Sequence, residues 1–301
     1  MKDAPVDAAT LPVPAVRRSS GLGDYVALTK PRLNFLVVAT SAAAYYLGGP
    51  RSPDIVAMSQ AVAGTALVAG GAAVLNQLYE RDTDALMRRT RLRPLPDGRV
   101  ALTDARLFGF GLSTAGLLLL ALRANWLAAA LALATLVIYL VVYTPMKRRT
   151  SLSTLVGAVP GALPALIGWT ASHGTIAIGG ATLFAIVFLW QIPHFMAIAW
   201  LYRDDYGKAG FPMLPVIEPE GHRAGRQAVV YAAALVPVSL VPTIVGIAGS
   251  VYFVSALVLG VVLFVLAARF AMTRSERSAR ALFFGSITYL PLLWAAMVFD
   301  H

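Results

Sequence analysis

The 301-residue chain contains no cysteine, and only 13% of its residues are charged. The missing cysteine excludes disulfides, thiolate metal sites and cysteine nucleophiles. Soluble domains carry roughly 25% charged residues, so the shortage of charge argues against a soluble protein. Hydrophobic residues make up 58% of the chain, and the mean hydropathy is +0.69. An integral membrane protein is therefore predicted.

The N-terminus lacks the apolar stretch of a secretory signal peptide. Residues 1–20 read MKDAPVDAATLPVPAVRRSS and are rich in proline, alanine and serine. We expect a disordered cytoplasmic tail over residues 1–22, followed by a single transmembrane domain over residues 23–301.

Apolar runs of about 20 residues, the length that crosses a bilayer as a helix, fill the rest of the chain. Backbone groups in lipid must be hydrogen-bonded within their own segment, so these runs are expected to be helices. The predicted fold is an all-α, polytopic membrane bundle of nine helices. Their approximate ranges are 28–48, 56–78, 105–122, 125–145, 152–171, 176–200, 228–248, 250–270 and 281–299.

The loops carry positive charge on one side only. The net charge is +10, and 23 of the 25 lysines and arginines fall in alternate loops, while Arg51 and Arg123 fall in the others. Cytoplasmic loops collect Lys and Arg, so we place the N-terminus in the cytoplasm and the C-terminus outside. The basic residues are spread over five segments without interleaved aromatic residues, which argues against a nucleic-acid partner.

Two cytoplasmic loops, residues 79–104 and 201–227, are long, and both begin with acidic residues. Asp84 precedes Pro94 by ten residues, and Asp205 precedes Pro215 by the same interval. This short correspondence suggests two four-helix halves followed by a ninth helix.

The end of the second apolar run carries three oxygen-bearing side chains at helical spacing, Asn76, Glu80 and Asp84. Positions i, i+4 and i+8 share one helix face and span about 12 Å at 1.5 Å per residue. Hard cations such as Mg²⁺ take oxygen ligands, often together with substrate phosphates. Arg81, Arg89, Arg91 and Arg93 are nearby and suit phosphate oxygens. A solvated helix end stabilised by Glu–Arg pairs is the alternative.

The end of the sixth run offers a second acidic pair, Asp204 and Asp205, with Lys208 one turn further on. Alone, this pattern is equally typical of an ordinary helix end. Together with the first stripe, on the same side of the membrane, it favours a site that holds one or two Mg²⁺ ions and a diphosphate.

With these motifs the chain resembles the UbiA superfamily of intramembrane prenyltransferases, and within it the branch that acts on haem. The resemblance covers about residues 28–217, in the stretches LTKPR, NQLYERDTDALMRRTRLRPLP, YTPMKRRT, TLVGAVPGALPALIGW, LWQIPHF and RDDYGKAGFPMLPV. Quinone-type members usually carry a second Asp-x-x-x-Asp motif, whereas here the spaced positions are Tyr202 and Tyr206.

The resemblance implies an activity: Mg²⁺-dependent transfer of a farnesyl group from farnesyl diphosphate to the 2-vinyl group of haem b, with addition of water, giving haem O. It implies a bacterial inner-membrane enzyme and, by pathway, haem A synthase as a possible partner. A prenyltransferase for a quinone precursor or chlorophyllide is the alternative. A divalent-cation transporter is a weaker one, because its site would lie near the midplane rather than at one face.

Site residues follow from the resemblance position by position. The catalytic set is Asn76, Glu80, Asp84 and Asp205, and the metal ligands are these four with Asp204. The diphosphate is assigned to Lys30, Arg32, Arg81, Arg89, Arg93, Lys147 and Lys208. Glu80, Leu92 and Ser153 replace residues common in the family (Asp, Asn and Asn), without loss of charge.

His194 is the one histidine well inside an apolar run, about 15 Å deeper than Asp204 along a helix. Buried histidines often serve only as hydrogen-bonded core groups. Because intramembrane ionisable residues are functional candidates and haem iron commonly takes histidine, a haem contact is the competing hypothesis.

Overall fold

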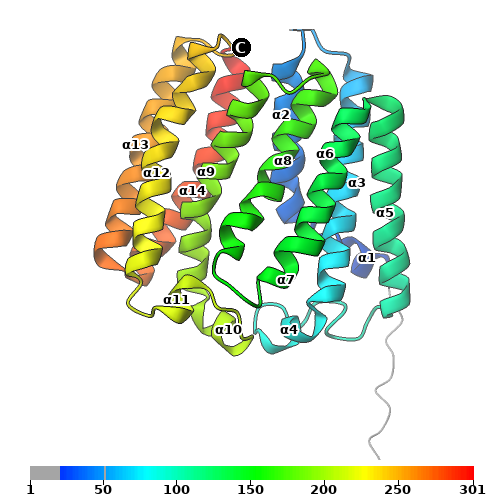
Figure 1. Ribbon diagram of the computed structural model, residues 1–301, viewed down its shortest axis with the longest axis vertical. Helices are drawn as coiled ribbons and strands as arrows, with labels where there is room; N and C mark the ends of the chain where they lie inside the picture. The colour runs from blue at the N-terminus through cyan, green and yellow to red at the C-terminus, as the bar shows by residue number, and fades with distance from the viewer. Residues whose placement is uncertain (1–20, 51) are drawn as a thin grey trace, which may run out of the picture.

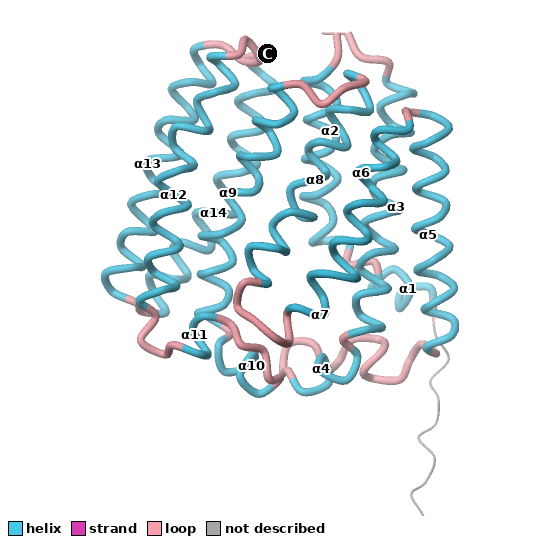
Figure 2. Tube along the Cα trace, in the orientation of Figure 1, coloured by secondary structure: helices cyan, strands magenta, loops and turns pink. Residues whose placement is uncertain are grey.

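The computed structural model describes residues 21–50 and 52–301. These residues form an all-helical bundle with no strand (Figures 1 and 2). The predicted tail lies outside the described residues except for positions 21 and 22, and the first helix begins at Leu22.

Long helices run side by side along the bundle. They are α2 (Pro31–Gly48), α3 (Ile55–Tyr79), α5 (Leu102–Arg123), α8 (Ser153–His173), α9 (Ile178–Leu201), α12 (His222–Ile244), α13 (Ser250–Thr273) and α14 (Glu276–Phe299). A further span joins α6 (Trp126–Val137), the π-helical η1 (Ile138–Tyr143) and α7 (Thr144–Met146).

Eight spans in the described chain are long and apolar enough to cross a membrane, and they match eight of the nine predicted runs. The remaining run corresponds to α2, whose first turn carries Pro31, Arg32 and Asn34 and is therefore more polar than the others. That α2 also crosses the membrane stays a prediction.

Several helices begin where a side chain caps the free backbone N–H groups. Asp54 accepts hydrogen bonds from the N–H groups of Val56 and Ala57, at 2.8 and 3.1 Å, and starts α3. Asn125 caps α6 in the same way through the N–H of Ala128, at 2.8 Å. Such caps satisfy donors that a helix start leaves unpaired, so the preceding side chain helps to determine where these two spans begin.

Small residues bring α3 and α5 close together. A Cβ at Gly116 would lie 2.6 Å from the carbonyl oxygen of Gly64, so only glycine allows this approach. Membrane helices lack a hydrophobic drive to associate and rely on such close packing.

The helices pack in a pattern that partly matches two halves. The second and third long helices of each half pair, α3 with α5 and α9 with α12, while α14 returns to α9. However, α2 packs mainly on α8, across the predicted boundary. One large apolar core is therefore shared by α2, α8, α9 and the three C-terminal helices.

Apolar side chains also cover the outside of the bundle. On α13, Val251, Val254, Val258 and Val265 are all more than half exposed. Exposed apolar rows of this length suit contact with lipid tails.

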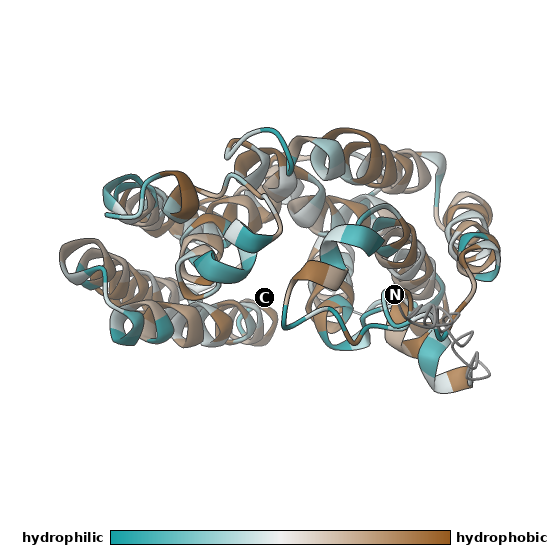
Figure 3. Ribbon diagram, turned by 90° about the horizontal axis from the view of Figure 1, so that it is seen from below, coloured by the Kyte–Doolittle hydropathy of each residue, from teal (hydrophilic) through white to brown (hydrophobic). Residues whose placement is uncertain are grey.

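Four short helices gather at one end of the bundle: α1 (Leu22–Leu28), α4 (Arg81–Leu86), α10 (Arg203–Lys208) and α11 (Leu214–Ile217) (Figure 1). Seen from this end, hydrophilic residues are concentrated on these segments and their loops (Figure 3). Both predicted acidic motifs therefore lie at the same end.

Candidate active site

The predicted stripe keeps its helical register through a break in the helix. α3 ends at Tyr79 and α4 begins at Arg81, with Glu80 between them at φ −93° and ψ 7°. The N–H of Glu80 still donates to the carbonyl of Asn76 (2.9 Å), and the N–H of Asp84 donates to that of Glu80 (2.7 Å). Asn76, Glu80 and Asp84 are all buried. Thus the three side chains form one continuous buried face, as the spacing predicts.

Each member of the stripe pairs with a different cation. Lys30 Nζ donates to Asn76 Oδ1 at 3.4 Å. Lys147 Nζ lies 3.0 and 3.3 Å from the two carboxylate oxygens of Glu80. Arg93 contacts Asp84 Oδ2 at 2.7 Å. The three cations come from three separate segments, so oxygen ligands and positive charges alternate at the end of α3.

Polar contacts hold the stripe in place. Asn76 Nδ2 donates to Thr144 Oγ1 at 3.2 Å, and that hydroxyl donates to the carbonyl of Tyr139 at 2.7 Å. Both Thr144 and Tyr139 lie at the π-helical turn η1 or its edge. Pro145 has no N–H for the carbonyl four residues earlier, and the widened turn η1 accommodates that loss.

Lys30 occupies a left-handed backbone conformation, with φ +50°, at the joint between α1 and α2. Gln77 supports this joint by donating to the carbonyl of Leu28 at 2.6 Å. Burial, together with the charge of Arg93, lowers the pKa of Lys30 to about 7. For Lys147, burial alone would lower the pKa, but Tyr143 and Glu80 outweigh it and the net pKa is raised. Lys147 is therefore a permanent charge, while Lys30 can change its charge near neutral pH.

Arg89 links the two long loops, residues 79–104 and 201–227. Its guanidinium carbon lies 5.3 Å from the ring centre of Tyr202 and 4.9 Å from that of Tyr206. Such cation–π contacts are favourable at distances up to about 6 Å. Tyr202 and Tyr206 thus hold an arginine from the opposite loop.

The second acidic motif is less buried than the first. Asp204 and Lys208 are exposed, and Asp205 is half-buried. Among the described residues, no three acidic or histidine side chains are grouped closely enough to hold a metal ion. The five predicted metal ligands are therefore not gathered into one cluster.

Two of the predicted diphosphate ligands lie away from the stripe. Arg81 pairs with the exposed Asp82 at 3.0 Å, and Arg32 is exposed on the first turn of α2. Lys30, Arg89, Arg93 and Lys147 instead surround the stripe or the cavity beside it.

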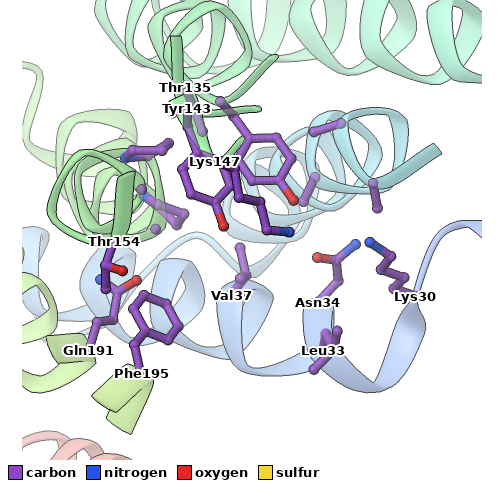
Figure 4. Close-up of a pocket in the computed structure, with 18 of the residues that line it drawn as sticks. Lys30, Leu33, Asn34, Val37, Thr135, Tyr143, Lys147, Thr154, Gln191 and Phe195 are labelled. Carbon is purple, nitrogen blue, oxygen red and sulfur yellow. The ribbon is translucent and has the colours of Figure 1, made fainter. Parts of the chain in front are cut away.

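A cavity of about 440 Å³ extends from these cations into the bundle. In Figure 4, Lys30 and Asn34 lie at one side, Gln191, Thr154 and Phe195 lie at the other, and Lys147 and Tyr143 are between them. Most of the remaining wall is apolar and comes from α2, α3, α8 and α9. The cavity can thus take a ligand with an anionic head and an apolar body.

His194 lines this cavity from α9. Its ring stacks between Trp190 and Phe283, with centroid distances of 5.2 Å to each. His194 Nδ1 lies 2.8 Å from the hydroxyl of Ser286, which belongs to α14. The ring is therefore both a packed core group and part of the cavity wall.

Gln191, Tyr139 and Tyr143 also line the cavity, although the sequence did not predict them as site residues. Gln191 is an uncharged polar residue in an apolar run, one turn before His194, and without its contacts to other helices it gives no functional signal. The tyrosines carried no signal, because aromatic residues are common at the ends of membrane helices.

The fold and site define a class of protein: a multi-pass membrane protein whose apolar cavity ends in cations, beside buried carboxylates that pair with positive charges. The model of the UbiA prenyltransferase family matches residues 36–289, and the chain belongs to that family.

Its relatives share most of their length with it. Protoheme IX farnesyltransferase from Solibacter usitatus (strain Ellin6076) is 44% identical over 287 residues, 92% of this chain and 98% of the relative. The protein of the same name from Myxococcus xanthus (strain DK1622) is 44% identical over 279 residues, 92% and 94% of the two chains.

Solved structures share the fold at low identity. One structure comes from structural and mechanistic work on the biosynthesis of digeranylgeranylglyceryl phosphate synthase in membranes. It has a TM-score of 0.79 at 18% identity, and the match covers 93% of this chain and 98% of that one. A UbiA homologue from Archaeoglobus fulgidus, bound to DMAPP and Mg²⁺, has a TM-score of 0.67 at 17% identity, covering 91% and 99%.

Proposed function

We propose that this protein transfers a farnesyl group from farnesyl diphosphate to the 2-vinyl group of haem b, with addition of water, giving haem O. The main observation behind this proposal is the buried stripe of Asn76, Glu80 and Asp84. Its side chains pair with Lys30, Lys147 and Arg93 beside an apolar cavity. The relatives named protoheme IX farnesyltransferase support the choice of substrates.

The stripe fits Mg²⁺ by the chemistry of its donors. An amide and two carboxylates offer only oxygen atoms, which a hard cation prefers, and all three are buried. Asp205 and the more exposed Asp204 are proposed as further ligands from the second loop. When bound, Mg²⁺ supplies Lewis-acid stabilisation of the diphosphate leaving group.

The cations of this chain bind and orient the diphosphate. Lys30, Lys147, Arg89 and Arg93 are proposed to contact its oxygens, with Arg32, Arg81 and Lys208 attracting the anion from the rim. Fixed positive charges in a site of low polarity stabilise developing negative charge strongly. The apolar wall receives the farnesyl chain and keeps bulk water away from the allylic cation.

His194 is proposed to face the haem, because it lines the same cavity as Lys30 and Lys147, which pair with the stripe. We further propose the bacterial inner membrane as the location. Because cytoplasmic loops collect Lys and Arg, the N-terminus is proposed to lie in the cytoplasm and the C-terminus outside. Haem A synthase would then be a pathway neighbour.

An assay of the detergent-purified protein with farnesyl diphosphate, Mg²⁺ and haem b tests the proposal. Mass spectrometry of the extracted haem should show a product heavier by one farnesyl group and one water, formed only with Mg²⁺. Unmodified haem, together with prenylation of an aromatic acceptor such as 4-hydroxybenzoate, would replace the haem assignment by a quinone-type one.

A further inference from the structure

The cavity wall on α9 presents an amide oxygen that receives no hydrogen bond from the described residues. Gln191 Nε2 donates to the carbonyl oxygens of Ala158 (3.2 Å) and Val187 (3.0 Å). Carbonyls only accept, so these two bonds determine the amide orientation and leave Oε1 as the free end. A Cβ at Gly161 would overlap this oxygen, so glycine makes room for it on α8.

His194 provides a second free acceptor on the same wall, one helical turn from Gln191. Its contact with Ser286 shows which ring nitrogen is free. Ser286 Oγ donates to the carbonyl of Phe283 at 2.7 Å, which uses its one hydrogen. Its 2.8 Å contact with His194 Nδ1 is then a hydrogen bond only if Nδ1 carries the proton. This tautomer leaves His194 Nε2 as an unprotonated base, and the described chain supplies no donor to it.

Trp190 and Phe283 prevent the imidazole from turning. Both rings stack on it, and Trp190 Nε1 donates to the backbone carbonyl of Ser286 at 2.7 Å. α9 and α14 are thereby joined around His194, and the orientation of its ring is fixed before any ligand binds.

Residues three apart on a helix lie on one face, and both Gln191 and His194 line the cavity. Two acceptors without protein donors suit a small molecule with two O–H donors, and water needs two to four polar partners to be held in a cavity. We propose that Gln191 Oε1 and His194 Nε2 hold the water that adds to the haem side chain, and that His194 takes its proton. The inference rests on the proposed function.

The π electrons of the vinyl group form the new bond to C1 of the farnesyl group as the C1–O bond to diphosphate breaks, and the diphosphate keeps that electron pair. Positive charge appears on the inner vinyl carbon, and a lone pair of the held water forms a C–O bond there. One water proton stays in the hydroxyl group, and the other moves to His194 Nε2.

Without a held water, the same cation would lose a proton from a neighbouring carbon and become an alkene. The product would then be farnesylated but lighter by one water. The ratio of hydroxylated to dehydrated product therefore reports on water placement separately from the rate of farnesyl transfer. An iron ligand would affect the haem spectrum instead.

The test uses the full-length protein in detergent with farnesyl diphosphate, Mg²⁺, haem b and ¹⁸O-labelled water. His194→Phe keeps an aromatic ring in the stack but removes the base, and Gln191→Met keeps the length but removes the oxygen. We expect the ratio of hydroxylated to dehydrated product to fall about 10²-fold in His194→Phe, the lower end of the range for loss of one acid–base group. In Gln191→Met we expect a fall of about tenfold, the effect of losing one hydrogen bond to the water. Ser286→Ala removes the hydroxyl that accepts from His194 Nδ1, and it should give a smaller fall. Ser286→Thr keeps this hydroxyl, so its ratio should equal that of the wild type.

His173→Gln is the matched control, because this histidine lies at the far end of α8, outside the cavity. If His194→Phe fails to accumulate in membranes, Gln191→Met carries the test by the same ratio. An unchanged ratio in both variants, or loss of both products together with a shifted haem spectrum, would overturn the inference and leave farnesyl transfer standing. A wild-type protein that does not modify haem at all would instead refute the proposed function.

Discussion

At the scale of single residues, Glu80 and Asp84 are each proposed to bind a metal ion, and each also forms an ion pair with a cation of this chain. Each carboxylate is buried and ion-paired, Glu80 with Lys147 and Asp84 with Arg93. Removing a carboxylate would therefore remove a proposed metal ligand and also leave a cation of this chain without its partner. Both effects weaken the binding of a metal–diphosphate complex, and neither requires the bundle to unfold.

Glu80→Gln and Asp84→Asn should each reduce turnover by on the order of 10²-fold or more, the usual effect of losing one electrostatic contact to the leaving group. Mass spectrometry of the haem product measures the loss, and size-exclusion chromatography checks that the protein is folded. Asp82→Asn is the control, because Asp82 is 84% exposed and points away from the stripe. Wild-type turnover in Glu80→Gln or Asp84→Asn would remove the basis for the proposed metal site.

Lys30 provides a prediction about pH, because burial lowers its pKa to about 7. A bound diphosphate stabilises the ammonium form, so binding above pH 7 requires uptake of a proton. The affinity for farnesyl diphosphate should then fall as pH rises above 7, by up to about tenfold per unit for one proton. Titrations of binding from pH 6 to 9 measure the slope.

Lys30→Arg is the matched variant, because arginine stays charged over this range. Its binding curve should be flatter above pH 7 than that of the wild type. Parallel curves for the two proteins would show that the pH dependence arises elsewhere, for instance in the diphosphate itself.

The sequence predicted the stripe but not its partners, for a physical reason. Spacing along one helix tells which side chains share a face, so Asn76, Glu80 and Asp84 could be grouped without a structure. That Lys147, rather than Arg81, contacts Glu80 depends on how the end of α7 packs on α3. The sequence did not predict Gln191 and Ser286 as site residues for the same reason, because their proposed roles depend on contacts between helices.

At the scale of elements, the two long basic loops meet through Arg89 and the α10 segment. Met87 from the first loop packs with Tyr206, Phe211 and Met213 from the second, beside the cation–π contacts of Arg89. The loops therefore form one cover over the cations at the end of the cavity. Tyr202 and Tyr206, which flank Asp204 and Asp205, contribute to this cover through their contacts with Arg89.

Tyr206→Leu should weaken the binding of farnesyl diphosphate by loosening Arg89. A cation–π contact of about 0.5–2 kcal/mol corresponds to a rise in KM of roughly 2- to 30-fold. Tyr206→Phe keeps the ring and should stay within about twofold of the wild type on the same grounds. Steady-state kinetics with varied farnesyl diphosphate distinguish the two, and an equal KM in both variants would exclude the cation–π role.

The π-helical turn was beyond sequence prediction, although Pro145 was visible. Proline indicates that one backbone hydrogen bond is lost, but not whether the helix kinks, ends or widens. Here η1 widens, and its two tyrosines, Tyr139 and Tyr143, stack on each other at 5.4 Å beside the cavity. Most other span boundaries lie within three residues of prediction, but α12 begins six residues earlier and ends four earlier, and α14 begins five residues earlier.

At the scale of the whole molecule, hydrophobicity alone predicted a helical membrane protein and the positions of most of its spans. Lipid permits few alternatives to a helical bundle. The arrangement of helices was harder, since small-residue contacts such as Gly64 with Gly116 have no periodic signal. The packing of α2 on α8 joins the predicted halves and was not foreseen. Orientation in the membrane rests on charge asymmetry and remains a prediction.

That orientation can be measured cleanly because the chain has no cysteine. Leu92→Cys and Thr175→Cys each introduce one thiol at an exposed position, in the long loop after α4 and in the loop between α8 and α9. In spheroplasts, a membrane-impermeant maleimide should label Thr175→Cys, and it should label Leu92→Cys only after lysis. The reverse pattern would place the basic loops outside. The proposed site would then open away from the cytoplasm, where Arg89, Arg93 and Lys147 could not receive a diphosphate made inside the cell.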